Sequence, residues 1–368
     1  MTDISCFVPH VQKHVEVILT KRYIGLSHEG LVIKNPQPSC PSFEKNANCD
    51  RFTVVVPYAG TSVEFIVMFQ ATQPECPPDF LFSDLKFFVP IDELESLHNW
   101  DVQETDGLFK VVKEIMYYYK KKNMEDLEKY TELNYEYLSL FQIRNFSEDD
   151  IEVYVPSKAK TPITMLVRLH VEFCDVLPDV TQRSGYESAL LLLIFSDRDN
   201  EKCSQRLYLS EEIKNALGLN GNFEFPGHMR EFQLNRYIVA VEDKLRCQVD
   251  LVASRYESRK TYFAKFLSHF YNCVVEYDIF YFHNMVLLLE VEDFNFLLEI
   301  NLPENFPTGV PDLIFRSIYH TCSGVPTSVV VDSYPYCSSW SLEKVFNETV
   351  KSIEAYAIML KEDSEPYF

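Results

Sequence analysis

Apolar and polar positions alternate most clearly between Asp50 and Phe82. Two apolar runs flank Pro57-Tyr58-Ala59-Gly60, a pattern that predicts a β-hairpin. The second run leads into Gln73-Pro74-Glu75-Cys76-Pro77-Pro78 and then the apolar residues 80–82. Proline lacks the backbone donor of a sheet ladder and fixes φ. We therefore expect the chain to leave the sheet here as a stiff, extended segment, which we call the proline exit.

The same pattern recurs from Phe296 to Phe315. Equivalent residues lie 233 positions apart, since 307 − 74 = 233. The matching residues are Pro74 with Pro307, Pro78 with Pro311, Asp79 with Asp312, Phe82 with Phe315, Phe65 with Leu298, and Phe69 with Leu302. Because solenoid repeats are much shorter, this spacing predicts two structurally related domains.

Apolar residues at helical spacing appear before and after each copy of the pattern. Residues 8–21 predict an amphipathic helix ahead of the first hairpin, and residues 258–270 predict one ahead of the second. A longer helical pattern covers 108–141, with Asn123 as a candidate break, and a last helix is expected over 342–360. Each copy is thus predicted to contain a helix, an antiparallel meander, a proline exit, a loop with one tryptophan (Trp100 or Trp340) and a closing helix.

The residues between the two copies show a different order of elements. Strands are expected at 151–155, 163–173, 189–195 and 206–209. Helices are expected to follow at 210–218, with Ser210 as its N-cap, and at 231–253. Strands followed by helices indicate an α+β unit. With the acidic residues 148–150 as a boundary, the predicted domains are 1–147, 148–253 and 254–368. The middle domain is either an independent unit or a degenerate third copy without the prolines.

Charge and cysteine content narrow the function classes. With 34 basic and 55 acidic residues the net charge is −21, which argues against binding to nucleic acid or to anionic membranes. Ten cysteines without a Cys-x-x-Cys pair fit a reducing compartment. Neither a charged-then-apolar leader nor an apolar run of membrane-spanning length is visible. We therefore expect a soluble protein of the cytoplasm and nucleus.

The repeated unit resembles the ubiquitin-conjugating E2 fold. Domains of that family carry a Tyr-Pro-x-x-Pro-Pro exit, a His-Pro-Asn segment, the catalytic cysteine and a tryptophan before the second helix. The two proline exits, Gln73–Pro78 and Phe306–Pro311, match the first feature, and Trp100 and Trp340 match the last. Ile318-Tyr319-His320 matches only the beginning of the His-Pro-Asn segment.

The position of the family's nucleophile holds no cysteine in either copy. The first copy has none between Cys76 and Cys174. In the second, Cys322 and Cys337 lie before and after the expected position, which is occupied by Val329-Val330-Val331. Thioester exchange needs a thiol nucleophile with an amide donor for the oxyanion. Both copies therefore resemble inactive ubiquitin E2 variants (UEV domains), and no catalytic, metal or cofactor-binding residue is assigned.

Two UEV-like domains flanking a middle α+β unit, itself a candidate degenerate UEV/RWD-like copy, resemble the BRE (brain and reproductive organ-expressed) family. The resemblance rests further on Asn48-Cys49-Asp50-Arg51-Phe52, Phe266-Leu267-Ser268-His269-Phe270 and Tyr334-Pro335-Tyr336. It implies a non-catalytic adaptor in BRISC-type and BRCA-associated A complexes, beside a JAMM-type zinc deubiquitinase that prefers lysine-63-linked ubiquitin. It also implies an MPN-minus (Abraxas-type) scaffold and a von Willebrand-A-like (MERIT-type) subunit as partners, with ubiquitin as a further candidate ligand. Two alternatives stay open: a stand-alone ubiquitin-binding receptor and a divergent active E2.

Two further groups of residues have both a functional and a structural interpretation. Tyr117, Tyr118 and Lys121 form a candidate partner contact, since tyrosines beside cations favour interfaces. A helix spreads such a run around its axis, so some of these tyrosines are expected in the core. His10 and His14 have the i, i+4 spacing of a metal site, but no third ligand at suitable spacing accompanies them. An exposed helix face is the simpler expectation for both. Cys40 and Cys49 likewise lack the partners of a zinc site.

Overall fold

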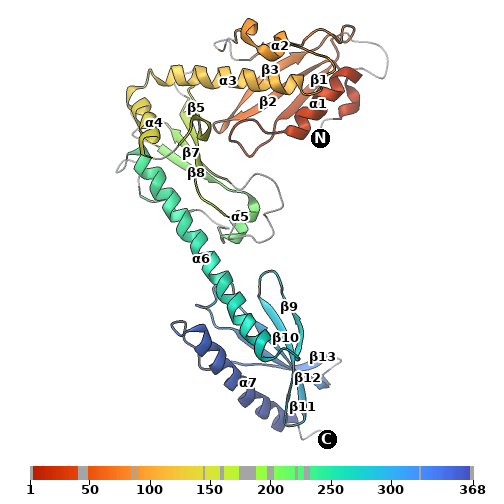
Figure 1. The fold of residues 1–368 in the computed structure, drawn as a ribbon, viewed down its shortest axis with the longest axis vertical. Coiled ribbons are helices and arrows are strands. Elements are labelled where there is room, and N and C mark those ends of the chain that lie inside the picture. Colours follow the sequence, from red (N-terminus) through yellow and green to blue (C-terminus); the bar gives the residue numbers. More distant parts are fainter. Residues whose placement is uncertain are drawn as a thin grey trace. The chain divides into compact units, whose positions relative to one another are not determined.

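The hairpin predicted between Asp50 and Phe82 is present in the computed structural model (Figure 1). Strands β2 and β3 pair antiparallel from Arg51 opposite Met68 to Tyr58 opposite Thr61. Ala59 and Gly60 between them have φ of 45° and 75°, the left-handed pair that suits a two-residue hairpin turn. The first sheet has the order β1-β2-β3-β4. Its strands are β1 (Val32–Gln37), β2 (Arg51–Tyr58), β3 (Thr61–Met68) and β4 (Asp79–Phe82).

The structure describes residues 3–39, 49–83, 87, 89–143, 146–157, 161–173, 188–196, 203–219, 223–227, 233–322 and 325–364. For residues 143, 319–322, 325–327, 360 and 362–364 it describes the backbone alone. The chain forms two compact units, and each is described by itself. The first contains the first sheet and the middle sheet, and the second contains the C-terminal sheet.

Helices α1 (Pro9–Lys21) and α3 (Gly107–Leu127) pack on one face of the first sheet (Figure 1). The predicted first helix is confirmed, and its apolar stripe, Val11, Val15 and Ile18, is fully buried. Burying one such side chain contributes about 1.5–3 kcal/mol. The shorter elements of this region are η1 (Ile4–Cys6), η2 (Ile91–Glu93), α2 (Glu95–His98) and α4 (Thr131–Ile143).

The break in the long helical pattern was predicted at the wrong place. The interruption lies at residues 128–130, between α3 and α4, whereas Asn123 is buried inside α3. Its side-chain amide donates to the Tyr119 carbonyl at 2.8 Å, and its Oδ1 accepts from the Val155 N–H at 2.8 Å. These tertiary partners satisfy the side chain and offset the low helix propensity of asparagine.

The middle sheet is antiparallel with the order β5-β6-β7-β8, so the four predicted strands are present. Both central strands are buried at nearly every position, which means that both faces of this sheet are covered. Ser210 caps the following helix, as its position predicts, by accepting the Ile213 N–H at 3.2 Å. The elements are η3 (Glu148–Asp150), β5 (Ile151–Tyr154), β6 (Ile163–Leu169), β7 (Ala189–Phe195), β8 (Cys203–Tyr208) and α5 (Glu211–Ala216).

The prediction of two separate helices at 231–253 and 258–270 is wrong. A single helix, α6 (Leu234–His269), runs through both ranges. The connecting residues 254–257 include neither glycine nor proline, so nothing local stops the helix there. The predicted boundary between residues 253 and 254 falls within α6, and the three-domain division stays a prediction.

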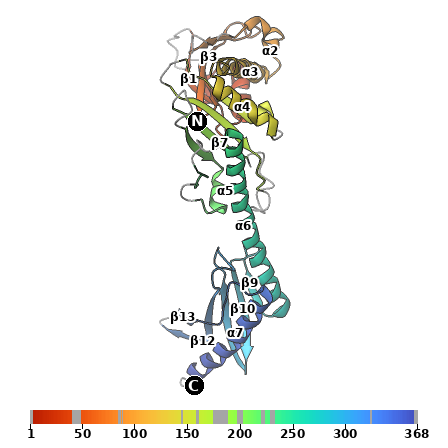
Figure 2. The same cartoon turned by 90° about the vertical axis from the view of Figure 1, so that its left-hand side faces the viewer.

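The C-terminal sheet has the order β13-β12-β11-β10-β9, and α7 with the end of α6 packs on one face of it (Figure 2). A loop was expected between the second proline exit and the closing helix. The strands β12 and β13 occupy most of that range instead, and Leu313 and Phe315 of β12 extend the sheet core. The elements are β9 (Val274–Tyr277), β10 (Asn284–Val291), β11 (Phe294–Asn301), β12 (Asp312–Cys322), β13 (Val325–Val330) and α7 (Leu342–Ser364).

Strand register in the C-terminal sheet reproduces that of the first sheet at the 233-residue offset. Phe65 lies opposite Phe82 in the first sheet, and Leu298 lies opposite Phe315 in the C-terminal sheet. The turn residues Glu292 and Asp293 have φ of 49° and 67°, like Ala59 and Gly60. The internal repeat is therefore a property of the fold. The described chain is a mixed α+β structure with three antiparallel sheets and seven α-helices.

Candidate functional site

The two proline exits bury the same member of the repeat. Pro78 and Pro311 are buried, and each stands immediately before the aspartate that begins a strand. Pro74 and Pro77 are exposed, while Pro307 is half-buried and follows a cis peptide bond. Each proline exit is therefore anchored by a buried proline at its last residue, whereas the burial of the preceding prolines differs between the two copies.

Two tyrosines hold the second exit to the segment before Trp340. The Tyr334 hydroxyl donates to the Pro311 carbonyl at 2.8 Å, and the Tyr336 hydroxyl donates to the Pro307 carbonyl. Burial raises the pKa of Tyr336 to about 12, so this hydroxyl stays protonated near neutral pH and remains a donor. Two tyrosine hydroxyl groups therefore hold the backbone of the second proline exit in one conformation.

Trp100 and Trp340 occupy corresponding places, each shortly before its closing helix. Trp100 packs against His14 and Phe69, with ring centroids 5.0 and 6.0 Å apart. The Lys344 ammonium lies 4.0 Å from the centroid of the Trp340 ring, in a cation–π contact. Both side chains are half-buried and pack against the core of their own sheet.

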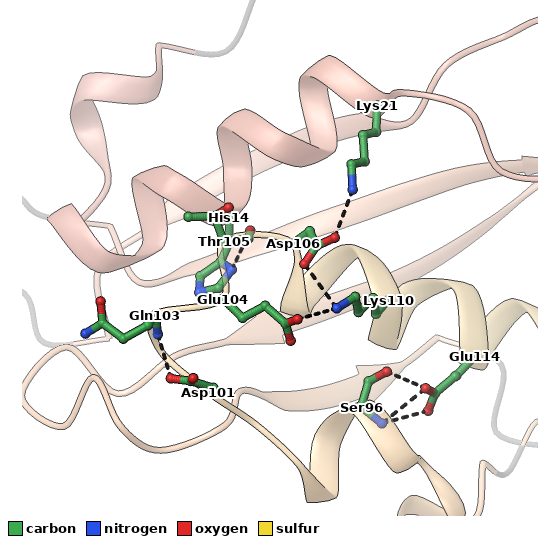
Figure 3. Close-up of polar contacts among 10 residues, drawn as sticks. All are labelled: His14, Lys21, Ser96, Asp101, Gln103, Glu104, Thr105, Asp106, Lys110 and Glu114. Atoms are coloured by element: carbon green, nitrogen blue, oxygen red, sulfur yellow. Dashed lines mark hydrogen bonds and ion pairs between the residues drawn. The ribbon is translucent and has the colours of Figure 1, made fainter.

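Polar contacts fasten the segment 101–106 to helices α1 and α3 (Figure 3). The Lys21 ammonium lies 2.9 Å from the Asp106 carboxylate, and Lys110 contacts both Asp106 and Glu104. One turn further along α3, the Ser96 N–H donates to the Glu114 carboxylate at 3.1 Å (Figure 3). These contacts give the region of the first tryptophan a defined position.

The expectation that His10 and His14 lie on an exposed face is wrong. His14 is buried and stacks on Phe69 at 5.7 Å, and His10 is half-buried against the same ring. Burial lowers the pKa of His14, and its Nδ1 lies 3.0 Å from the Thr105 carbonyl (Figure 3). A carbonyl oxygen only accepts, so Nδ1 carries the proton. Within the described ranges, no three His, Cys, Asp or Glu side chains gather in a way that could hold a metal ion.

The resemblance to the E2 family places the nucleophile position at Val329-Val330-Val331, and these residues lie at the end of β13. Val329 and Val330 are exposed there, and Val331 is buried. Cys322 ends β12, and its side chain lies outside the described residues. Cys337 is half-buried in the loop before Trp340, with its sulfur 3.0 Å from the Ser339 hydroxyl. Hydrogen bonding from Ser339 lowers the pKa of the Cys337 thiol, so this cysteine has more thiolate character than a buried structural cysteine.

The run Tyr117–Lys121 on α3 is divided between surface and core, as helical geometry predicts. Tyr117 is 64% exposed and Lys121 is exposed one turn further on, whereas Tyr119 is buried. Tyr118 is half-buried, and its hydroxyl donates to Glu93 at 3.0 Å. Tyr117 and Lys121 share one helix face at i, i+4. They remain a candidate partner contact.

A cavity of about 480 Å³ in the first unit was not predicted from the sequence. Its wall joins β3 and β4 to the middle sheet, so its residues become neighbours only in the folded chain. Aromatic rings and hydroxyl groups line it, together with the Glu64 carboxylate; the aromatic members are Phe82, Phe87, Tyr119 and Tyr154.

Known proteins match this chain along nearly its whole length. A model of the brain and reproductive organ-expressed protein (BRE) family matches residues 5–321. A Danio rerio protein named BRISC and BRCA1-A complex member 2 is 34% identical over 364 residues, covering 96% of this chain and 93% of that protein. A Branchiostoma floridae protein of the same name is 32% identical over 349 residues, covering 92% and 90%. None of the helices in the described ranges is long and apolar enough to cross a membrane. The chain belongs to the BRE family.

Proposed function

We propose that this chain is a non-catalytic adaptor subunit of a BRISC-type deubiquitinase complex in the cytoplasm and nucleus. The observation that carries the proposal is the match over 92% and 96% of the chain to proteins named as BRISC and BRCA1-A complex members. The other subunits would be a JAMM-type zinc deubiquitinase that cleaves lysine-63-linked polyubiquitin, its MPN-minus (Abraxas-type) scaffold and a von Willebrand-A-like (MERIT-type) subunit.

In this proposal the two terminal copies are UEV-like domains that present surfaces instead of performing chemistry. Support comes from the shared strand register, the paired proline exits and the paired tryptophans. The exposed valines at the family's nucleophile position also support it, since a valine side chain cannot attack a thioester. The middle unit would join the two domains.

Reconstitution tests the proposal directly. The full chain is co-expressed with the three partner subunits, and the assembly is measured by size-exclusion chromatography with mass detection. We expect one stoichiometric complex, and we expect cleavage of lysine-63-linked chains to fall when this subunit is omitted. A chain that elutes apart from the deubiquitinase contradicts the adaptor function.

The two alternatives give different results in simple assays. An active E2 incubated with ubiquitin-activating enzyme, ATP and ubiquitin would form a thioester, so a reducible adduct at Cys322 or Cys337 would contradict the proposal. A stand-alone receptor would bind ubiquitin in the absence of partners, as measured by titration of ubiquitin into the isolated chain. The proposed adaptor function predicts neither a thioester adduct nor binding of ubiquitin by the isolated chain.

A further inference from the structure

The C-terminal sheet begins with apolar side chains that are exposed to solvent. They lie on β9 and in the loop 278–281, and they are 37% to 61% exposed: Val275, Tyr277, Ile279, Phe280 and Tyr281. We call them together the β9 surface. β9 is the last strand in the sheet order, and β10 is the strand that pairs with it in the described residues (Figures 1 and 2). An edge strand leaves alternate backbone N–H and C=O groups facing outward.

Hydrogen bonds and an aromatic contact hold the loop that carries Ile279, Phe280 and Tyr281 in place. The Asp278 carboxylate accepts the N–H groups of Phe280, Tyr281 and His283 at 3.0, 3.1 and 3.2 Å. Phe282 packs on Phe263 of α6, with ring centroids 6.1 Å apart. A loop that is already ordered loses little conformational entropy when a partner binds. The exposed side chains therefore form a prepared contact surface.

A buried arginine strengthens this support. Arg259 on α6 is 7% exposed, and its Nε donates to the Tyr281 carbonyl at 3.0 Å. A second nitrogen of the same guanidinium donates to the Glu304 carbonyl at 3.1 Å. Because the guanidinium is buried and donates to backbone carbonyls, the positive charge is not presented at the β9 surface.

The chain segment that contains the β9 surface is anionic. From Phe266 to Phe315 the sequence includes no lysine or arginine. It includes eight carboxylates in the same range: Glu276, Asp278, Glu290, Glu292, Asp293, Glu299, Glu304 and Asp312. Glu292 and Glu299 pair with Lys361 and Arg316, whereas Glu276 lies exposed within β9 itself. Apolar groups in this field favour a partner with apolar and cationic side chains together.

The edge of the first sheet lacks these properties. β1 contains Lys34, which pairs with Glu64 at 3.3 Å, and Pro36, which has no backbone donor. Lysine and proline are residues that block an edge strand from pairing with another chain. β9 reads Val-Val-Glu-Tyr and contains neither. The two copies of the repeat therefore differ at this edge strand, because lysine and proline are present in β1 and absent from β9.

We propose that the β9 surface binds an extended segment of a partner protein, in which apolar residues alternate with lysine or arginine, as an added strand beside β9. Main-chain hydrogen bonds would supply affinity, and alternate side chains would contact the apolar loop and Glu276. The inference builds on the proposed function, because the segment would belong to another subunit of the complex.

A peptide probe tests the surface on the full chain without any other subunit. The probe is a short fluorescein-labelled peptide of alternating valine and arginine, and the control peptide alternates valine and glutamate. Fluorescence anisotropy at physiological ionic strength is expected to show binding at least about tenfold tighter for the arginine peptide. The arginine peptide should also slow amide hydrogen exchange at residues 274–277.

Two variants separate the proposed contact from general attraction to an acidic protein. The triple change Ile279→Ser, Phe280→Ser and Tyr281→Ser keeps the charge and is expected to weaken binding by about tenfold or more. The matched control changes Ile358→Ser and Met359→Ser, exposed residues on α7, and should bind as the unchanged chain does. Glu276→Lys should weaken binding of the arginine peptide and strengthen binding of the glutamate peptide. Thermal unfolding verifies that each variant folds.

Two results would overturn the inference. Equal binding by the triple variant would show that charge alone attracts the peptide. Self-association of the unchanged chain that the triple variant abolishes, measured by sedimentation, would assign the surface to a second copy. Failure to assemble with the deubiquitinase would count against the proposed function alone, since the peptide assay does not contain that enzyme.

Discussion

The Glu152 carboxylate on β5 accepts a hydrogen bond of 2.9 Å from the backbone N–H of Ala59, in the turn between β2 and β3. Its other oxygen accepts the Leu26 N–H at 2.7 Å, and the Thr164 hydroxyl donates to the Ala59 carbonyl at 2.6 Å. The first hairpin is thus joined to the middle sheet through both polar groups of one residue. The equivalent turn of the second copy, Glu292-Asp293, is exposed. One turn of the repeat therefore serves as an internal joint, and the other does not.

The Glu152 joint is expected to depend on pH. Burial raises the pKa of Glu152 above its ordinary value of 4.5, even though the hydrogen bonds from Ala59 and Leu26 lower it. The folded chain therefore holds this proton more tightly than the unfolded chain does. The resulting stability is full below pH 4.5 and is lost as the pH rises through the folded pKa. Glu152→Gln removes the ionisation, so the unchanged chain should lose stability relative to this variant as the pH rises.

Urea unfolding of both proteins between pH 4 and pH 8 measures this difference. A difference in unfolding free energy that is constant across the range would contradict the raised pKa. Glu152→Ala serves as a second variant. It leaves two buried N–H groups without an acceptor and should cost about 1–3 kcal/mol for each at neutral pH.

Gly60 tests the same joint from the side of the turn. A Cβ at this position would lie 2.6 Å from Leu192 of the middle sheet, and the φ of +75° already disfavours other residues. Gly218 has a similar φ of +65° but open space around it, so Gly218→Ala is the matched control. We expect Gly60→Ala to exceed the control by about 1–3 kcal/mol of lost unfolding free energy, because only the first change overpacks a contact. Equal losses in denaturant unfolding would show that the turn is not tightly docked.

His14 should make the chain less stable at mildly acidic pH. Burial lowers the pKa of His14 below its ordinary value of 6.5, so the unfolded chain binds the proton more readily. Stability is therefore present above pH 6.5 and is lost as the pH falls toward the folded pKa. His14→Phe removes this titration, and its stability should change less between pH 7 and pH 5 than that of the unchanged chain. Parallel stability profiles, measured by urea unfolding, would contradict the buried neutral state.

Cys337 and Cys203 should differ in their reactivity toward alkylating reagents. Hydrogen bonding from Ser339 lowers the pKa of Cys337, whereas burial raises the pKa of Cys203 to about 12. Since the thiolate is the nucleophile, iodoacetamide should label Cys337 well before Cys203 near neutral pH. Ser339→Ala is expected to slow labelling of Cys337 and leave Cys203 unchanged. Peptide mapping by mass spectrometry measures both rates, and faster labelling of Cys203 would refute the assignment.

Local sequence alone determined the repeat and the positions of its turns and proline exits. Proline fixes φ and lacks a donor, so the two exits and their 233-residue spacing could be located without any tertiary information. The hairpin at Ala59-Gly60, the first helix and the cap at Ser210 follow from equally local rules, and the structure confirms them. The family resemblance rested on these same local signals, and the comparisons confirm it.

Tertiary contacts decided the features that sequence reasoning missed. Asn123 stays within a helix because Val155 satisfies its side chain, and His14 is buried because Phe69, Trp100 and Thr105 surround it. These partners lie far away in the sequence, so periodicity gives no signal for them. The joint at Glu152 and the β9 surface have the same origin. Sequence determined where the chain turns and which residues are apolar, whereas burial and hydrogen-bond satisfaction, which exist only after folding, decided which of those residues meet.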